Sequence, residues 1–512
     1  MKTRGHNIFA RLLRKEGVRR LLAAALFAAP LLSSAPARAV NLYPGNGAAM
    51  STPSADLFLP SAELAAQCGV IKTVKFGGGA DYSNISGAIA SLNLAGSIST
   101  NTCVVVLDNS VYTESVLVQG IATNGYRLRI MADPAFTGGA PQVRDSGSGY
   151  SFSIQNDSVT LQGIDISPLN TFTYGVRFLN SAFCELSEST ITLAASTYAG
   201  IYFSGASSNT VSDVYVSNPN GDAVTMLGGS NLNSISSSTL LADGFEKSVL
   251  YIEYSSSNTV SYSFLSNPSS FGPHFKGGGY NTVRFSTITG NSSTYAPVMF
   301  DAEAGTMNGI EDSYVFNALG NAVDLGSNGF IGRSAITGGG AAGYAVRFSG
   351  TYSQVSDSII LSTTSTAIIF ASGNNTINRS TVTSRSAAGY AVQFMGSSNS
   401  QVLDSYIYNV YGTAIYLQAG SGYNTISGST VTANAAGKYA VYGDNSGNNT
   451  ITRSFIYNPA GTAVFLSNFG SANSISYSTI TTSAANYTAL NITDAGNTRV
   501  VSSYLQGAAA LV

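Results

Sequence analysis

The sequence predicts an all-β chain, a right-handed parallel β-helix whose coils of about 24 residues each hold three short strands. Three observations predict this fold. The segment from Asn424 to Val431 recurs 25 residues later as the segment from Asn449 to Ile456. The same Asn-Thr-Ile-x-x-Ser-x-Ile pattern extends through most of the chain, at steps of 21 to 27 residues. Within each repeat the apolar residues are two positions apart, which is the spacing of strands and not of helices.

The composition also favours one long repeat array over several globular domains. Only 10% of the 512 residues are charged, yet 44% are hydrophobic, which argues against disorder. Self-similarity of this period indicates stacked units that cannot bury their apolar faces alone. Leucine-rich repeats have a similar length but require a Leu-x-x-Leu-x-Leu pattern, which is absent here. The right hand follows from the usual preference of crossover connections.

Residues 1–39 are interpreted as a secretory signal peptide. A basic head is followed by 12 apolar residues from Leu21 to Leu32, and then by a small-residue cleavage site ending at Ala39. The alternative is an uncleaved anchor helix, for which 12 residues are short. No later stretch is long and apolar enough to cross a membrane. We therefore expect an exported protein, either secreted or held at the cell surface.

Residues 40–99 are expected to form an N-terminal cap, and residues 100–512 the β-helix. A short helix is expected after Ser61, which suits the N-cap position, with Gly69 closing it. A second helix is expected from about Tyr82 to Leu92. Its apolar side has helical spacing and consists of Ile85, Ala88, Ile89 and Leu92. Such helices protect the open end of a stacked sheet, where backbone groups lack strand partners.

Charge and cysteine content restrict the partners. Removal of the signal peptide leaves 16 basic and 25 acidic side chains, a net charge of about −9, which repels phosphate backbones and disfavours nucleic acid. The mature cysteines, Cys68, Cys103 and Cys184, have no metal-ligand spacing. A disulfide between Cys68 and Cys103 and three separate buried thiols are equal alternatives. We expect no metal and no cofactor.

The opening coils resemble a known family. The helix ending at Leu92, the valine strand from Val104 to Leu107, and the segment from Val111 to Glu114 before another apolar strand carry the resemblance. This order is similar to the start of pectin-esterase-type proteins and related right-handed β-helix proteins, which belong to the pectate-lyase-like superfamily. Those chains usually place a Gly where this one has Ser110. The resemblance implies the same fold across nearly the whole mature chain.

One position of the repeat is an asparagine in most coils. At a corner, stacked amides can hydrogen-bond to their counterparts above and below, and Asn tolerates a left-handed backbone. We interpret this column as structural. Its members are Asn209, Asn233, Asn258, Asn281, Asn375, Asn424, Asn449 and Asn473.

Another position alternates between threonine and an aromatic residue, as in Thr381, Tyr406, Thr430 and Phe455. The repeating unit is therefore two coils. Large and small side chains that alternate along an outer strip can pack against each other, which is the structural interpretation of this column.

Titratable groups concentrate between Asp243 and Asp312. Alignment of the first strands stacks Glu253, Lys276 and Asp301 on three successive coils, near the only histidine of the mature chain. Such groups would perturb one another's pKa values, as acid–base catalysis requires. The alternative is an exposed ladder of neutralised charges. The candidate catalytic residues are Glu253, His274, Lys276, Asp301 and Glu303.

The resemblance implies that catalytic groups of lyases and esterases lie on such an outward face. The signatures of those relatives are missing, however. The chain has no Asp-Asp pair with His-Gly as in polygalacturonases, and no Asp cluster with Arg as in calcium-dependent pectate lyases. It also lacks the later Asp and Arg motifs of pectin esterases.

Aromatic residues give the second indication of function. They share the outward column of the first strand, and aromatic faces can stack on sugar rings. Packing between coils is the alternative explanation. The candidate ligand-binding residues are Tyr202, Tyr251, Tyr416 and Tyr442.

Our hypothesis is an exported, non-catalytic protein that binds carbohydrate or a cell-surface polymer, as an adhesin does. The first alternative is a polysaccharide-degrading lyase or esterase that uses the polar patch near residues 253–303. The second is a structural spacer of a larger surface protein. Because the sequence stops in mid-coil at Val512, we expect further sequence or a partner to cover that end.

Overall fold

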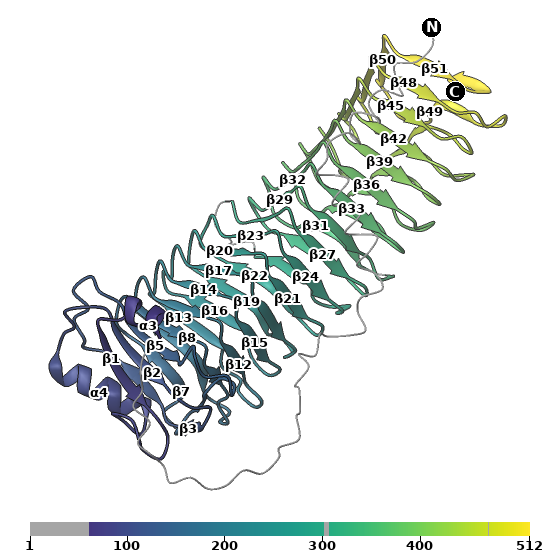
Figure 1. Cartoon of the computed structure of the whole chain (residues 1–512). Helices are drawn as coiled ribbons and strands as arrows, with labels where there is room; N and C mark the ends of the chain where they lie inside the picture. Colours follow the sequence, from purple (N-terminus) through teal and green to yellow (C-terminus); the bar gives the residue numbers. More distant parts are fainter. Residues whose placement is uncertain (1–60, 302–306, 342, 469, 512) are drawn as a thin grey trace, which may run out of the picture. The chain divides into compact units, whose positions relative to one another are not determined.

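The computed structural model describes residues 61–301, 307–341, 343–468 and 470–511. The predicted signal peptide and Glu303 lie outside the described residues. Residues 61–512 form one compact unit. In this unit each coil adds one short strand to each of three parallel sheets (Figure 1). The predicted all-β parallel β-helix with three strands per coil is therefore confirmed.

The first sheet contains the strands that open each coil of the repeat. They are β4 (Val116–Val118), β7 (Tyr150–Ile154), β10 (Tyr174–Leu179), β13 (Ile201–Ser204), β16 (Val224–Leu227), β19 (Ser248–Glu253), β22 (Phe271–Lys276), β25 (Val298–Phe300), β28 (Val323–Leu325), β31 (Tyr344–Phe348), β34 (Thr366–Phe370), β37 (Val392–Phe394), β40 (Ile415–Leu417), β43 (Val441–Asp444), β46 (Val464–Ser467), β49 (Thr488–Ile492) and β52 (Ala509–Leu511).

The second sheet contains the Asn-Thr-Ile segments. Its strands are β1 (Val70–Val74), β2 (Thr102–Val106), β5 (Leu128–Ala132), β8 (Val159–Gln162), β11 (Glu185–Ser187), β14 (Thr210–Ser212), β17 (Ser234–Ser236), β20 (Thr259–Ser261), β23 (Thr282–Arg284), β26 (Gly309–Glu311), β29 (Phe330–Gly332), β32 (Gln354–Ser356), β35 (Thr376–Asn378), β38 (Gln401–Leu403), β41 (Thr425–Ser427), β44 (Thr450–Thr452), β47 (Ser474–Ser476) and β50 (Arg499–Val501).

The third sheet contains the Ser-x-Ile segments. Its strands are β3 (Val111–Thr113), β6 (Gln142–Arg144), β9 (Asp165–Ile166), β12 (Thr190–Thr192), β15 (Tyr215–Asn218), β18 (Thr239–Ala242), β21 (Phe264–Asn267), β24 (Thr287–Gly290), β27 (Tyr314–Asn317), β30 (Ala335–Gly338), β33 (Ile359–Ser362), β36 (Thr381–Ser384), β39 (Tyr406–Asn409), β42 (Thr430–Ala433), β45 (Phe455–Tyr457), β48 (Thr479–Thr481) and β51 (Tyr504–Gln506).

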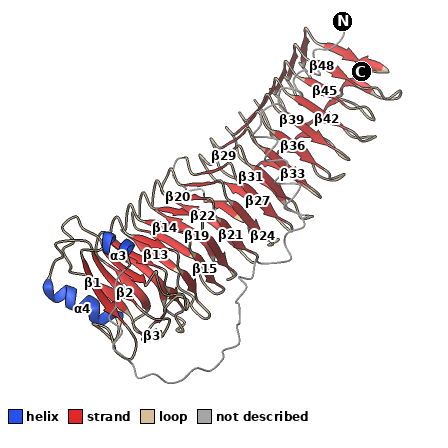
Figure 2. Cartoon of the chain, in the orientation of Figure 1, coloured by secondary structure: helices blue, strands red, loops and turns tan. Residues whose placement is uncertain are grey.

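Two helices lie at the N-terminal end of the described residues, drawn blue in Figure 2. Helix α3 (Ala62–Gln67) begins after Ser61, whose hydroxyl accepts from Leu64 N at 3.1 Å, so this predicted N-cap is confirmed. Helix α4 (Ile85–Ala95) buries the four apolar residues that helical spacing predicted. Within the described residues, neither helix has the length and apolar character that crossing a bilayer requires.

Strand β1 is an element that the sequence analysis did not expect. It lies inside the segment assigned to the cap and pairs with β2 in parallel, so that Val70 faces Thr102. The second sheet therefore starts before the first recognisable repeat. Helix α4 packs against the first coils, in contact with β1, β2 and β4.

The interior contains columns of identical side chains. Phe348, Phe370 and Phe394 stack with ring centroids 4.7 Å apart, and all three are fully buried. Serine hydroxyls accept a hydrogen bond from the backbone N–H of the preceding coil, for example Ser429 Oγ from Ser405 N at 3.2 Å. Side chains about two dozen positions apart thus lie over one another, as the repeat predicted.

The asparagine column is a hydrogen-bonded ladder at the corner between the first and second sheets. Asn209, Asn233, Asn258 and Asn281 each donate from Nδ2 to Oδ1 of the next amide at 3.0–3.1 Å. The ladder continues to Asn308, which the sequence analysis did not include. The predicted ladder is confirmed, but the left-handed residue of the corner is the one before each asparagine, such as Ser208 before Asn209 and Tyr280 before Asn281.

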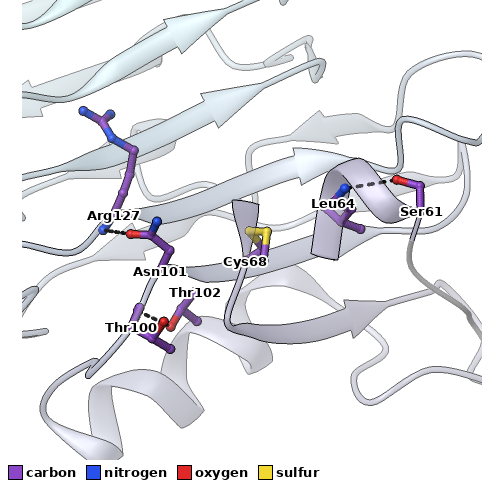
Figure 3. The surroundings of a disulfide bond; sticks show 8 residues. Ser61, Leu64, Cys68, Thr100, Asn101, Thr102 and Arg127 are labelled. Atoms are coloured by element: carbon purple, nitrogen blue, oxygen red, sulfur yellow. Dashed lines mark hydrogen bonds between the residues drawn. A yellow bond between two sulfur atoms is a disulfide. The ribbon is translucent and has the colours of Figure 1, made fainter. Parts of the chain in front are cut away.

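The N-terminal coils contain a disulfide between Cys68, at the end of α3, and Cys103 on β2 (Figure 3). Their Cα atoms are 5.8 Å apart, and both residues are buried. Close by, Asn101 Oδ1 accepts from Arg127 N at 3.0 Å and so connects the turn before β2 to the next coil. Of the two alternatives for these cysteines, the structure has the disulfide. Cys184 is free and buried.

Candidate functional site

The outward column of the first sheet brings the candidate residues together along one face. Strand register places Tyr202, Tyr251 and His274 in this column, and further along it Tyr416 and Tyr442. Period-two alternation explains the placement, because the residues on either side of each point inward. The four candidate tyrosines therefore share one face, as predicted.

The polar patch lies on the same face, and its charges are paired across neighbouring coils. Lys276 Nζ lies 2.9 Å from Glu253 Oε1, since these residues are register partners on β22 and β19. His274 Nε2 lies 3.1 Å from Asp301 Oδ2. His274 Nε2 is close enough to Asp301 Oδ2 for an ion pair, but its N–H is not aligned for a hydrogen bond. The predicted stack is thus divided into two pairs.

A third pair follows on the next coils. Arg347 Nη1 lies 3.5 Å from Asp324 Oδ2, and the hydroxyl of Ser349 donates to the other oxygen of this carboxylate. The sequence analysis did not name Asp324 and Arg347 as site residues. They could have been found from their strand register with His274, which puts them in the same column.

Aromatic rings enclose His274. The imidazole centroid lies 4.7 Å from the ring of Phe271 and 5.2 Å from the ring of Tyr251. Pro273, directly before it, has no N–H to donate to the neighbouring strand, so β22 departs from a regular ladder here. The histidine is consequently held in place by rings on two sides and by Asp301.

The two contacts shift the pKa values of Lys276 and Asp301 away from neutrality. Hydrogen bonding to Glu253 raises the pKa of Lys276, and the His274 side chain lowers the pKa of Asp301. General acids and bases work best with pKa values near the operating pH, so both directions oppose that role. The patch therefore has the electrostatics of a neutralised ladder.

Two other acids, half-buried Asp222 and buried Asp324, show the opposite direction. Burial raises the pKa of Asp222, although Ser248 N and Thr225 Oγ1 donate to its carboxylate at 2.7 and 3.0 Å. Burial likewise raises the pKa of Asp324. Sequence reasoning missed Asp222, because it lies in the loop before β16 and outside the repeat pattern. Its hydrogen bonds fix the start of β19.

The tyrosines of the column pack against one another. Tyr416 and Tyr442 are stacked with centroids 5.1 Å apart, and Tyr442 and Phe465 with centroids 5.5 Å apart. Tyr202 contacts Tyr174 at 4.6 Å. Burial, and then the charge of Asp444, raises the pKa of Tyr416 to about 12. Ring faces thus cover each other, and the hydroxyl of Tyr416 donates to Asp444 Oδ2 at 3.3 Å.

In the described part of the chain, no three His, Cys, Asp or Glu side chains come together in a way that could hold a metal ion. The acids of the patch instead face a basic side chain each, as described above.

The regular coil, the three sheets and the ladders define the fold, and a family comparison agrees with them. The family described as the right handed beta helix region matches residues 146–292, 199–360 and 344–505. The chain belongs to this family. The right-handed β-helix predicted from the repeat is confirmed. A comparison with curated protein sequences found no match.

Several solved structures are similar to this chain at low identity. Pectate lyase Pel9A is 13% identical with a TM-score of 0.40, over 52% of this chain and 74% of that one. Alginate lyase from Paenibacillus sp. str. FPU-7 is 12% identical with a TM-score of 0.29, over 75% and 99%. DFA-IIIase from Arthrobacter chlorophenolicus A6 is 10% identical with a TM-score of 0.40, over 67% and 95%. These likenesses assign no activity to the β-helix described here.

The pair of His274 and Asp301 predicts a pH-dependent stability. Because the folded pKa of Asp301 is lowered, its contribution is complete above the pKa of an unfolded Asp, about 3.9, and is lost as the pH falls through the folded value. We expect Asp301→Asn to lower the free energy of unfolding by up to about 1 kcal/mol near pH 5. Near pH 3, below the pKa of an unfolded Asp, the difference between the two proteins should be smaller than near pH 5. Urea titrations at both pH values measure this; an equal difference at both would contradict it.

Proposed function

We propose that the mature chain is an exported, non-catalytic protein that binds carbohydrate or a cell-surface polymer along the outer face of the first sheet. The observation that carries this proposal is the single outward column that contains Tyr202, Tyr251, Tyr416 and Tyr442, with a neutralised polar ladder between them. An extended strip of phenol hydroxyls, ring edges and paired charges suits a long polar ligand.

Three features support the other parts of the proposal. The basic and apolar N-terminus has the composition of an export signal. The disulfide is typical of oxidising compartments. The net charge of about −9 after signal removal disfavours nucleic acid as the polymer.

Binding is favoured over catalysis because the candidate catalytic groups are committed to one another. Lys276 is held by Glu253, and Asp301 by His274. A lyase or esterase needs at least one group that is poised to take or give a proton. A lyase or esterase activity would require the two side chains of one of these pairs to separate when substrate binds.

The test is retention of the purified mature protein on a glycan array and on immobilised polysaccharides. We expect Tyr416→Thr with Tyr442→Thr to weaken retention several-fold, since threonine already occupies this column as Thr225. The control is Phe455→Thr on the third sheet, which should bind as the wild type does. Amide exchange checks that the coils remain folded.

The same protein is assayed for ultraviolet-absorbing products from uronate polymers. Turnover that Lys276→Ala abolishes would overturn the binding proposal in favour of a lyase. A protein that neither binds nor turns over any polymer would instead be a structural spacer.

A further inference from the structure

A row of large apolar side chains projects from the corner between the first and second sheets. The row consists of Phe183, Leu232, Tyr280, Met307, Tyr352 and Tyr423, which are between 60% and 67% exposed. Each of them stands two positions before a second-sheet strand, so strand register places them in one column. The tyrosine rings of the row are far more open than those of the first sheet.

These residues adopt a backbone conformation that disfavours them. Tyr280, Tyr352 and Tyr423 have φ between 58° and 60°, in the left-handed region. A bulky side chain there costs about 1 kcal/mol or more, whereas Asn is tolerated. In other coils the same column does contain Asn, at Asn328 and Asn374. The chain thus accepts both strain and exposed apolar area at these positions, a combination found at functional sites.

The residue that follows each member of the row fixes its position. Asn281 follows Tyr280 and Asn424 follows Tyr423, and both belong to the buried ladder. Asn424 N donates to Asn449 Oδ1 at 2.9 Å, and its Nδ2 donates to Ser397 O at the same distance. The exposed rings are therefore held on a rigid backbone, which lowers the entropy lost when a ligand binds.

The turns of four members of the row, Leu232, Tyr280, Tyr352 and Tyr423, are polar and uncharged. The turns 228–233, 277–281, 349–353 and 418–424 contain Gly, Ser, Thr, Asn, Gln and Ala beside the exposed residue, and no charged side chain. The next outward residues offer hydroxyls and an amide, at Ser234, Thr282, Gln354 and Thr425. Open aromatic faces beside neutral hydrogen-bonding groups match a neutral sugar, and offer no counter-charge to a uronate or phosphate.

We infer that this corner row is a binding track for a neutral polysaccharide that lies across successive coils. The inference rests on the proposed function and names its ligand class. The row borders the outer face of the first sheet, because each of its turns begins where a first-sheet strand ends. Tyr280, Tyr352 and Tyr423 are three coils apart from one another in turn. At about 4.8 Å per coil they are about 14 Å apart, so a chain of sugar rings meets these three rings at regular intervals.

The test compares variants by affinity electrophoresis in gels containing xylan, a soluble β-glucan or polygalacturonate. The triple variant Tyr280→Asn, Tyr352→Asn and Tyr423→Asn installs the residue that this column uses elsewhere. We expect at least tenfold weaker retention by the neutral polymers and an unchanged or higher Tm. Tyr477→Asn is the control, since Tyr477 is also exposed and left-handed but lies at the other corner of the second sheet.

Each other outcome overturns the inference in a recognisable way. Full retention of the triple variant, with loss in the Tyr416→Thr and Tyr442→Thr protein, overturns the corner track and keeps the proposed function. Retention by polygalacturonate alone overturns the neutral ligand class. A dimer in sedimentation that the triple variant lacks shows that a second copy occupies the row. No retention of the wild type by any polymer overturns the proposed function as well.

Discussion

Replacement of Asn258 by alanine is expected to lower the free energy of unfolding by about 3–5 kcal/mol. The side chain is buried and makes four hydrogen bonds. Its Oδ1 accepts from N and Nδ2 of Asn233 at 2.9 and 3.1 Å, and its Nδ2 donates to Ser230 O and Asn281 Oδ1 at 2.9 and 3.0 Å. Without the amide these partners stay buried and unpaired, which costs more than the bonds themselves contribute.

The matched control for this change is Thr259→Ala on the neighbouring residue, which points outward from β20. Its effect should remain below about 0.5 kcal/mol, as for an ordinary surface substitution. Because coils of a solenoid can open locally, amide hydrogen exchange in the coils around Asn258 is the appropriate measurement. Equal protection in both variants would show that the ladder does not stabilise the corner.

Replacement of Phe370 by alanine is expected to lower the free energy of unfolding by a similar amount, about 3–5 kcal/mol. Its ring is fully buried and stacks between Phe348 and Phe394, with both centroids 4.7 Å away. Removal leaves a cavity that two rigid neighbouring coils cannot close, since their backbones are fixed by strand pairing on both sides.

Phe455→Ala is the control for the stack, because Phe455 lies on the outer face of the third sheet and is 41% exposed. We expect it to cost less than about 1 kcal/mol. Urea denaturation followed by far-ultraviolet circular dichroism compares the two variants. Comparable losses in both would contradict the assignment of Phe370 to the interior.

The sequence allowed the coil, the strand type and the inward columns to be predicted, because each depends on spacing. A residue such as Asn424 recurs at coil length, and parallel stacking converts that period into contact. Strand β1 was not expected, since Val70–Val74 shows none of the repeat pattern, although it pairs with β2 of the next coil. Asn308 was missed because the coil before it has an unusual length.

The sequence predicted which residues of the candidate site lie side by side on neighbouring strands, but not which of their side chains are in contact. Alignment placed Lys276 between Glu253 and Asp301, and only side-chain direction decides that it pairs with Glu253. His274 could have faced solvent, yet it contacts Asp301 and two rings. Stacking also turned the face of Tyr442 toward Phe465, which spacing alone does not show. The exposed corner residues did have a signal, because Tyr280 and Tyr423 directly precede ladder asparagines.

The central claim is that the distance in space between two residues of one column depends on the number of coils between them. Spin labels on Thr282→Cys with Thr425→Cys, and on Thr210→Cys with Thr425→Cys, test it by pulsed electron resonance in a Cys184→Ser background. These pairs are six and nine coils apart. At about 4.8 Å per coil we predict separations of about 29 and about 43 Å. Distances that do not increase in proportion to the number of coils would contradict the stacked β-helix.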